Sequence, residues 1–137
     1  MRYTAAYGSN LEREHMSSLC PDAVFVCVSR LTGYRLAFRG TFLTVEKAAG
    51  HSVPIGIWKI SERDEKALDI WENYPEEYYK EPVSPECFVY IMHEHIPYAL
   101  PDYDYLEMCI NGYKDTGFDT TLIREAYLFS AKKLNQY

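Results

Sequence analysis

Residues 7–11, which read Tyr-Gly-Ser-Asn-Leu, constrain the fold of this chain more than any other stretch. The apolar run from Tyr3 to Ala6 just before them predicts a strand, and the composition of residues 11–19 predicts a helix. The chain must therefore pass from strand to helix through Gly, Ser and Asn. Glycine allows backbone conformations that other residues avoid, and Ser or Asn at a helix start accepts a hydrogen bond from an otherwise unpaired N–H group.

A turn of this composition has two interpretations. Its backbone N–H groups point outward at the positive end of a helix dipole, where a carboxylate or a developing oxyanion is held. Alternatively, it is a capped turn that binds no ligand, because a short motif by itself is only a hypothesis. The stretch predicts either an anion-binding loop or a purely structural one, and other residues must decide between them.

The length and charge of the chain limit the number of domains and the kinds of partner that we expect. We expect residues 1–137 to form a single domain, because 137 residues suffice for one packed core. The sequence is 47% hydrophobic and contains 13 Tyr, which supports such a core. Its 14 basic and 20 acidic residues give a net charge of −6. We therefore expect neither nucleic acid nor an anionic membrane as a partner, because both require a basic surface.

The cysteines favour a cytoplasmic protein. Cys20, Cys27, Cys87 and Cys109 are widely spaced, and no secretory signal precedes the first predicted strand. We therefore expect reduced thiols, as is usual in the cytoplasm. The longest apolar runs are far shorter than the roughly 20 residues of a membrane-spanning helix, so we also expect a soluble chain.

Alternating polarity predicts a largely β middle section. We expect strands at residues 23–31, 34–39, 53–60, 78–82 and 87–96, with a short one at 41–45. Thr32-Gly33 predicts the tight turn of a hairpin, and residues 48–50 predict a mobile connection. Pro54 indicates an edge strand or the entry to a strand, because proline cannot donate a ladder hydrogen bond.

Three further helices complete the predicted fold. Ser61 and Asp64 have the spacing of a capping box, and the helix that they begin should end near Asn73. A second helix starts at residues 101–102 and is ended by Gly112 and Gly117, and a third starts at residues 119–121. This order of elements predicts an α+β fold, with a small, closed or nearly closed mixed sheet and helices at its rim.

Glu72 is the acidic residue best suited to catalysis. It lies four residues after Leu68, at the edge of the apolar stripe in the last turn of its predicted helix. Partial removal of its carboxylate from water would raise its pKa toward neutrality and suit it to proton transfer. The alternative is an exposed acid at a helix edge, and we expect Glu76 and Glu77 in the following loop to be solvated.

His93 and His95 form the rival candidate site. On a strand they share one face, and two imidazoles on one face can begin a metal site. A third ligand is needed, and His15 and His51 lie at no matching spacing. The alternative is a pair of partly exposed strand residues, and we expect no metal.

A series of motifs, in order along nearly the whole chain, resembles the gamma-glutamylcyclotransferase-like proteins. They are Tyr7-Gly8-Ser9-Asn10-Leu11, Cys20-Pro21, Gly33-Tyr34-Arg35-Leu36-x-Phe38, Pro54-x-Gly56-x-Trp58, Leu68-Asp69-x-x-Glu72-x-Tyr74-Pro75, and Tyr105 followed by Ile110-x-Gly112-Tyr113 and Gly117-Phe118. The resemblance implies a small mixed β-barrel with flanking helices.

The resemblance also implies roles for particular residues. The loop of residues 7–11 would bind the amino-acid end of a small-molecule γ-glutamyl substrate, Glu72 would act as general base and acid, and Tyr105 would face the substrate. The implied reaction is attack of the substrate's own α-amine on its γ-carbonyl, which releases 5-oxoproline and an amine without any cofactor. In the family the Glu is commonly followed by Gly, whereas this chain has Asn73, a residue that tolerates left-handed backbone.

Two other functions stay open beside this enzyme of the transferase or lyase type. One is a binding module that keeps the same cavity and carries out no turnover. The other is a metal-dependent small barrel that uses His93 and His95.

Overall fold

The computed structural model describes residues 2–137, which form a five-stranded mixed sheet and four α-helices. The sheet has the strand order β2-β3-β1-β5-β4. Central β1 pairs antiparallel with β3 and parallel with β5, and the pairs β2–β3 and β4–β5 are antiparallel. The strands are β1 (Arg2–Ala6), β2 (Val24–Arg39), β3 (Phe42–Ile60), β4 (Tyr78–Ser84) and β5 (Cys87–Met92).

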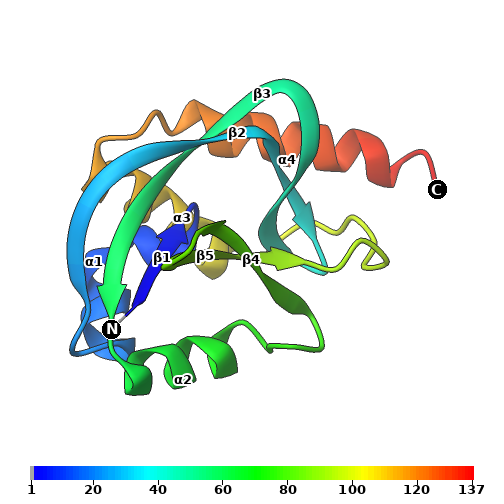
Figure 1. Ribbon diagram of the computed structural model, residues 1–137. Coiled ribbons are helices and arrows are strands. Elements are labelled where there is room, and N and C mark those ends of the chain that lie inside the picture. The colour runs from blue at the N-terminus through cyan, green and yellow to red at the C-terminus, as the bar shows by residue number, and fades with distance from the viewer. Residues whose placement is uncertain (1) are drawn as a thin grey trace.

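The helices lie around this curled sheet (Figure 1). Long β2 and β3 arch over the molecule with α4 along the top, while α2 runs along the bottom. The α+β class is confirmed. Because β2 and β4 are both edge strands, the sheet is not closed, and the word barrel describes it only loosely. The helices are α1 (Arg13–Leu19), α2 (Glu62–Trp71), α3 (Tyr103–Thr116) and α4 (Thr121–Leu134), with a 3₁₀ turn η1 (Ser9–Leu11) before α1.

The β2–β3 hairpin is longer than the sequence predicted. β2 runs through Thr32 and Gly33, so the predicted tight turn there is wrong. Gly33, at φ +82°, instead accompanies a register shift between Thr32 and Tyr34. The chain reverses at Gly40 and Thr41, which have φ values of +54° and +69°. The mobile connection predicted at residues 48–50 is also wrong, because these residues lie in β3.

Pro54 lies neither in an edge strand nor at the entry to a strand, so both interpretations of this proline are wrong. It lies in β3, between β2 and β1 in the sheet order. On one side it pairs with Arg30 of β2. On the other side β1 ends at Ala6, opposite Gly56, so no residue of β1 lies beside Pro54. A proline is therefore tolerated in an inner strand where only one neighbouring strand pairs with it.

Two helix boundaries also differ from their predictions. The helix expected over residues 11–19 is split, because extended backbone at Glu12 separates η1 from α1. Gly112 lies inside α3 and does not end it. The helix ends at Gly117, whose φ of +79° gives the left-handed backbone that is common after a helix.

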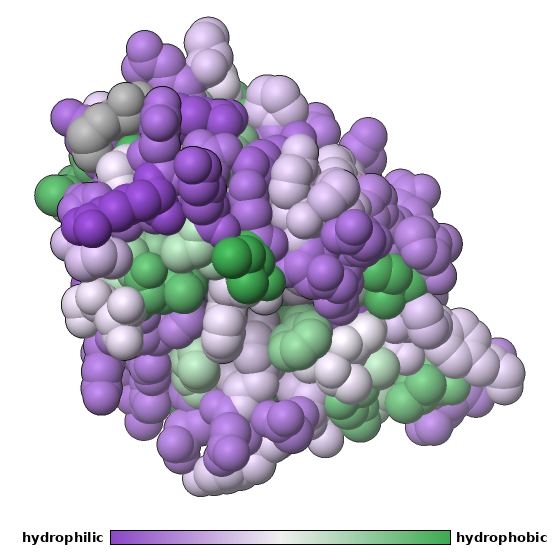
Figure 2. All heavy atoms as spheres, turned by 90° about the horizontal axis from the view of Figure 1, so that it is seen from below, coloured by the Kyte–Doolittle hydropathy of each residue, from purple (hydrophilic) through white to green (hydrophobic). Residues whose placement is uncertain are grey.

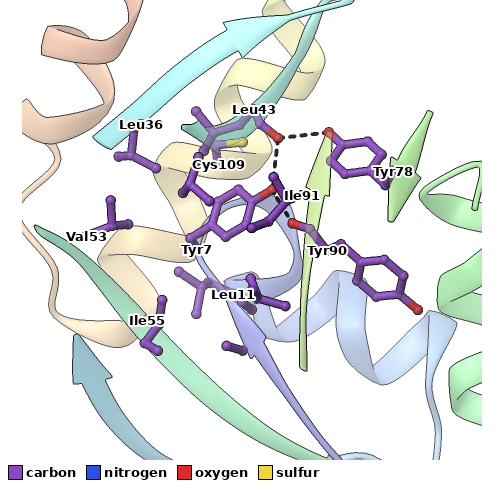
Figure 3. Close-up of a cluster of buried hydrophobic side chains, with 14 of the residues drawn as sticks. Tyr7, Leu11, Leu36, Leu43, Val53, Ile55, Tyr78, Tyr90, Ile91 and Cys109 are labelled. Atoms are coloured by element: carbon purple, nitrogen blue, oxygen red, sulfur yellow. Dashed lines mark hydrogen bonds between the residues drawn. The ribbon is translucent and has the colours of Figure 1, made fainter. Parts of the chain in front are cut away.

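The hydrophobic core lies between the inner face of the sheet and α3 (Figure 3). Burial of each large side chain contributes roughly 1.5–3 kcal/mol, so this cluster fixes the end of β1 and the residues that follow it. Among its members are Tyr7, Leu11, Leu36, Leu43, Val53, Ile55, Tyr78, Tyr90, Ile91 and Cys109.

The face that carries α2 is mostly hydrophilic, with separate small hydrophobic patches (Figure 2). Ile70 on α2 is 83% exposed. Isolated exposed apolar side chains of this kind are normal on protein surfaces. Within residues 2–137, no helix combines the length and apolar character needed to cross a membrane.

Candidate active site

Glu72 occupies the position immediately after α2, and the start of that helix is firmly capped. The Asp64 N–H donates to Ser61 Oγ (3.2 Å), and the Ser61 N–H donates to Asp64 Oδ2 (3.1 Å). The predicted capping box is therefore confirmed. Leu68 anchors the helix in the core with no exposed surface. Asn73 then takes φ +50°, the left-handed geometry that the sequence analysis expected asparagine to tolerate, and the chain turns away from the helix.

The loop after β1 is held in place by close contacts on several sides. The Tyr7 hydroxyl donates to the backbone oxygen of Tyr90 (2.8 Å), which ties the loop to β5 (Figure 3). A Cβ on Gly8 would lie 2.9 Å from Leu43 Cδ2. A Cβ on Gly112 of α3 would lie 3.0 Å from the Gly8 oxygen. Glycine is required at position 112, because the loop backbone approaches too closely for a side chain, whereas at Gly8 the close atom is the end of the Leu43 side chain.

The loop and the acid meet directly. The Asn10 Nδ2 amide donates to Glu72 Oε1 over 3.0 Å. His15 of α1 lies on the other side of Asn10, with its Nε2 atom 2.9 Å from Asn10 Oδ1. Within residues 2–137, the backbone N–H groups of Gly8 and Asn10 have no hydrogen-bond acceptor. These donors and the Glu72 carboxylate together form a polar cluster at the end of β1.

Two cavities share Glu72 and Tyr105 in their walls. The first has a volume of about 20 Å³, room for roughly one water molecule, and is lined by Ala5, Ala6, Tyr7, Gly8, Ser9, Asn10, Leu43, Glu72, Tyr90 and Tyr105. The second has a volume of about 80 Å³ and is lined by Phe42, Trp71, Glu72, Glu77, Tyr78 and Tyr105. The carboxylate therefore lies between a narrow cavity at the loop and a wider aromatic one.

Burial raises the pKa of Glu72 from its ordinary value of 4.5 to about 8. The hydrogen bond from Asn10 opposes this shift, and the nearby Glu77 carboxylate adds to it. Although Glu72 as a whole residue keeps some exposed surface, its carboxyl group is crowded by the loop and the tyrosines. A group with a pKa of about 8 exchanges protons near neutral pH, as a general base or acid must.

The tyrosine hydroxyls and the Cys109 thiol around Glu72 stay protonated. Burial raises the pKa values of Tyr7, Tyr78 and Tyr105 well above 10, so their hydroxyls are neutral. Burial likewise raises the pKa of the Cys109 thiol to about 12. Among these side chains, Glu72 is the one whose protonation changes most readily around neutral pH. Burial also raises the pKa of the neighbouring Glu77 carboxyl group.

The structure brings together most of the residues that the sequence analysis selected. Tyr7, Gly8, Ser9, Asn10 and Glu72 line the narrow cavity. Tyr105 lines both cavities, and its hydroxyl accepts a hydrogen bond from the Leu43 N–H (3.1 Å). Leu11 differs from the rest, because it is fully buried in the core and does not line either cavity.

Several residues at the site carried no local signal in the sequence. Glu77 was expected to be solvated, but it is half-buried and lines the wider cavity. Phe42 and Leu43 come from the start of β3, which only the sheet pairing brings beside α3 and the loop. Trp71, which precedes Glu72, lines the wider cavity. His15 was considered only as a distant metal ligand, whereas it contacts Asn10.

His93 and His95 lie apart from this cluster. Their rings stack with centroids 5.7 Å apart, and His93 Nε2 lies 2.7 Å from the Pro75 backbone oxygen. Within residues 2–137, no three or more His, Cys, Asp or Glu side chains are grouped as metal ligands would be. The geometry gives His93 a contact with the loop after Glu72.

The chain thus combines a curled mixed sheet with a first loop that meets an acid at the end of α2. The family described as gamma-glutamyl cyclotransferase, AIG2-like, matches residues 4–107. The chain belongs to this family, as the sequence motifs indicated. No curated protein sequence matches the chain.

Solved structures share this fold. A protein titled gamma-glutamyl cyclotransferase is 25% identical, with a TM-score of 0.73 over 91% of this chain and 85% of that one. The human protein loc79017, titled uncharacterized, is 24% identical, with a TM-score of 0.69 and the same coverage. YkqA from Bacillus subtilis is 15% identical, with a TM-score of 0.68 over 95% of this chain and 54% of that one.

Proposed function

We propose that this chain is a γ-glutamyl cyclotransferase that converts a γ-glutamyl amide to 5-oxoproline and a free amine, with Glu72 as general base and acid. The observation that carries the proposal is the 3.0 Å hydrogen bond between Asn10 and Glu72 at the wall of a shared cavity. Family membership supports the reaction class.

The loop would bind and orient the substrate. The free N–H groups of Gly8 and Asn10 suit a carboxylate or the oxygen of the γ-carbonyl as it becomes negative. Ser9 and Tyr7 would line the rest of this cavity, which has room for about one water molecule and would widen to admit the γ-glutamyl group. Binding that folds the γ-glutamyl group on itself places the α-nitrogen against the γ-carbon, and such placement lowers the barrier by several kcal/mol.

Glu72 would move the proton. Its carboxylate takes a proton from the α-amine as the bond between that nitrogen and the γ-carbon forms. The bond between the γ-carbon and the leaving nitrogen then breaks, and the Glu72 carboxyl group returns the proton to that nitrogen. One residue can serve both steps because its pKa of about 8 is close to the working pH.

The wider cavity would receive the leaving amine. It adjoins Glu72 on the side away from the loop and has Phe42, Trp71 and Tyr78 in its wall. Tyr105, which lines both cavities, packs edge to face against Phe42 of the wider one, with ring centroids 5.0 Å apart. The amine would therefore leave on the side of these rings, while 5-oxoproline forms against the loop.

The four free cysteines support a cytoplasmic setting for this reaction, because thiols stay reduced there. The substrate would be a small molecule and not a nucleic acid, in keeping with the net charge of −6.

The test is product analysis with the purified protein and a panel of γ-glutamyl amides that differ in the amine. We expect 5-oxoproline and the free amine in equal amounts. Matched substrates with an acetylated α-amine should give no product, because the nucleophile is blocked. Release of glutamate in place of 5-oxoproline would mean hydrolysis and would contradict the proposal. Tight binding with no product from any compound would instead support the non-catalytic binding module.

A further inference from the structure

The Asn10 side-chain amide lies between two partners. Its Nδ2 atom is 3.0 Å from Glu72 Oε1, and its Oδ1 atom is 2.9 Å from His15 Nε2. The three side chains come from η1, α1 and the end of α2, so they join the loop to both neighbouring helices. His15, Asn10 and Glu72 thus form one continuous chain of hydrogen bonds.

When Glu72 is ionised, the chemistry of the three groups fixes the direction of each bond. An ionised carboxylate only accepts hydrogen bonds, so the NH₂ group of Asn10 must face Glu72. The amide oxygen then faces His15 and also only accepts, so His15 Nε2 must carry the hydrogen. Burial lowers the pKa of His15, which keeps the ring neutral with a single N–H group. That hydrogen is therefore on Nε2.

The His15 ring is held where this bond requires it. Its centroid lies 4.5 Å from the ring of Trp71, the last residue of α2, at an interplanar angle of 47°. The residue is half-buried and lies in the first turn of α1. Packing on Trp71 and the bond to Asn10 together restrict the ring to one orientation.

We propose that His15 is a positioning residue, whose Nε2–H group fixes the Asn10 amide in the orientation that donates to the Glu72 carboxylate and so favours the base form of Glu72. The reversed amide would turn its oxygen to Glu72, which could then form that bond only when protonated. In that arrangement Asn10 would donate to an unprotonated His15 Nε2. The amide orientation, the His15 tautomer and the Glu72 proton therefore change together.

This inference deepens the proposed function and rests on it for the catalytic role, but its physical core is testable without catalysis. Three substitutions of His15 separate the effect of its N–H donor from the effect of its aromatic ring. His15→Phe keeps an aromatic ring against Trp71 and removes the donor. His15→Gln places an amide N–H near the position of Nε2, and His15→Asn carries the same amide on a side chain too short to reach Asn10.

The first readout is the titration of the Glu72 carboxyl carbon by NMR, in the free protein. We expect His15→Phe and His15→Asn to raise the titration midpoint by about one pH unit, because the Asn10 amide is no longer held in the orientation that donates to the Glu72 carboxylate. His15→Gln should stay near the native midpoint. The carboxyl group of Glu77 and the groups of Tyr7, Tyr78, Tyr90, Tyr105 and Cys109 also face Glu72, so Glu72→Gln is needed to assign the signal.

The second readout is the pH profile of 5-oxoproline release. In His15→Phe, kcat/KM below the midpoint should fall roughly tenfold and recover at higher pH, whereas a merely structural defect would lower it at every pH. His15→Gln should restore the native profile. An unchanged Glu72 midpoint in folded His15→Phe, or a raised one in His15→Gln, would overturn the inference. If the native protein releases no 5-oxoproline, the proposed function fails, and the NMR titration still decides the role of His15.

Discussion

The side-chain amide of Asn10 donates to the carboxylate of Glu72 across 62 residues of sequence, over a distance of 3.0 Å. Asn10 belongs to the turn that ends β1, and Glu72 follows the last residue of α2. The bond supports the ionised form of a carboxyl group that burial otherwise disfavours. A loop suited to binding and an acid suited to proton transfer are thereby joined into one site.

The raised pKa of Glu72 predicts the pH dependence of the reaction. The base form of Glu72 is needed, so kcat/KM should rise with pH and level off above a midpoint of about 8. The measurement is 5-oxoproline release at low substrate concentration from pH 5.5 to 9.5. A profile that is flat from pH 5.5 upward would show that the group needed as base has an ordinary carboxylate pKa, which contradicts the assigned role.

Glu72 should also make stability depend on pH. Its pKa is raised in the folded state, so the folded protein binds a proton more tightly than the unfolded chain between pH 4.5 and about 8. The free energy of unfolding should therefore fall as pH rises through this window. Glu72→Gln removes the cost of burying an ionised carboxylate. It should therefore increase the free energy of unfolding by about 1–3 kcal/mol at pH 8, because solvent partly screens the charge.

Urea unfolding at pH 8 and near pH 5 checks this difference. The advantage of Glu72→Gln should shrink toward zero as pH falls toward 4.5, since the native residue is then protonated in both states. The control is Glu76→Gln, because Glu76 is exposed and should show no such trend. A Glu72→Gln protein that is less stable than the native one at pH 8 would argue against the raised pKa.

Tyr105→Phe tests the contact between α3 and the start of β3. The Tyr105 hydroxyl accepts from the Leu43 N–H at 3.1 Å, and its loss would leave that N–H without this partner. We expect a loss of about 1–3 kcal/mol in stability and a higher KM, since both cavities are walled by this side chain. Tyr103→Phe is the matched control, because Tyr103 is 73% exposed and bonds only to Glu107. Equal effects of the two changes would contradict a special role for Tyr105.

Gly112→Ala tests whether α3 sets the position of the loop. The added Cβ would lie 2.8 Å from the Glu12 backbone nitrogen and 3.0 Å from the Gly8 oxygen, so the loop must shift. Overpacking of this kind costs about 1–3 kcal/mol of stability, and a shifted loop should also lower kcat/KM. Lys114→Ala, at an exposed position of the same helix, should leave kcat/KM unchanged. Native activity in folded Gly112→Ala would show that the loop tolerates displacement.

The sequence predicted correctly those parts of the fold that depend on residues close together in the chain. The capping box at Ser61 and Asp64 begins α2 as expected, and Gly117 ends α3 through a left-handed residue. The turn at residues 32–33 and the connection at residues 48–50 were wrong for one reason. The two long strands continue through both stretches, and Gly33 and Gly50, with φ values of +82° and +81°, lie where the register shifts between Thr32 and Tyr34.

The candidate site likewise contains residues that the sequence motifs identified and residues that only tertiary packing brings there. The motifs selected Glu72 and the loop of residues 7–11, and the structure places the two beside each other. Leu11 shares the motif but packs in the core, since a motif records position along the chain and not direction of the side chain. Glu77 and His15 were missed as neighbours of the site because their contacts depend on how α1 and α2 pack together. That packing is a tertiary property with no periodic signal in the sequence.

The measurement that tests the central claim most directly is the rate of 5-oxoproline formation by Glu72→Gln at pH 8, beside the native protein and Glu76→Gln. Glutamine keeps an oxygen that can accept from Asn10 but cannot take a proton from the substrate amine. We predict a loss of about 10²–10⁴-fold in kcat, with substrate binding retained and with Glu76→Gln as active as the native protein. Full activity in a folded Glu72→Gln protein would contradict the claim that Glu72 moves the proton.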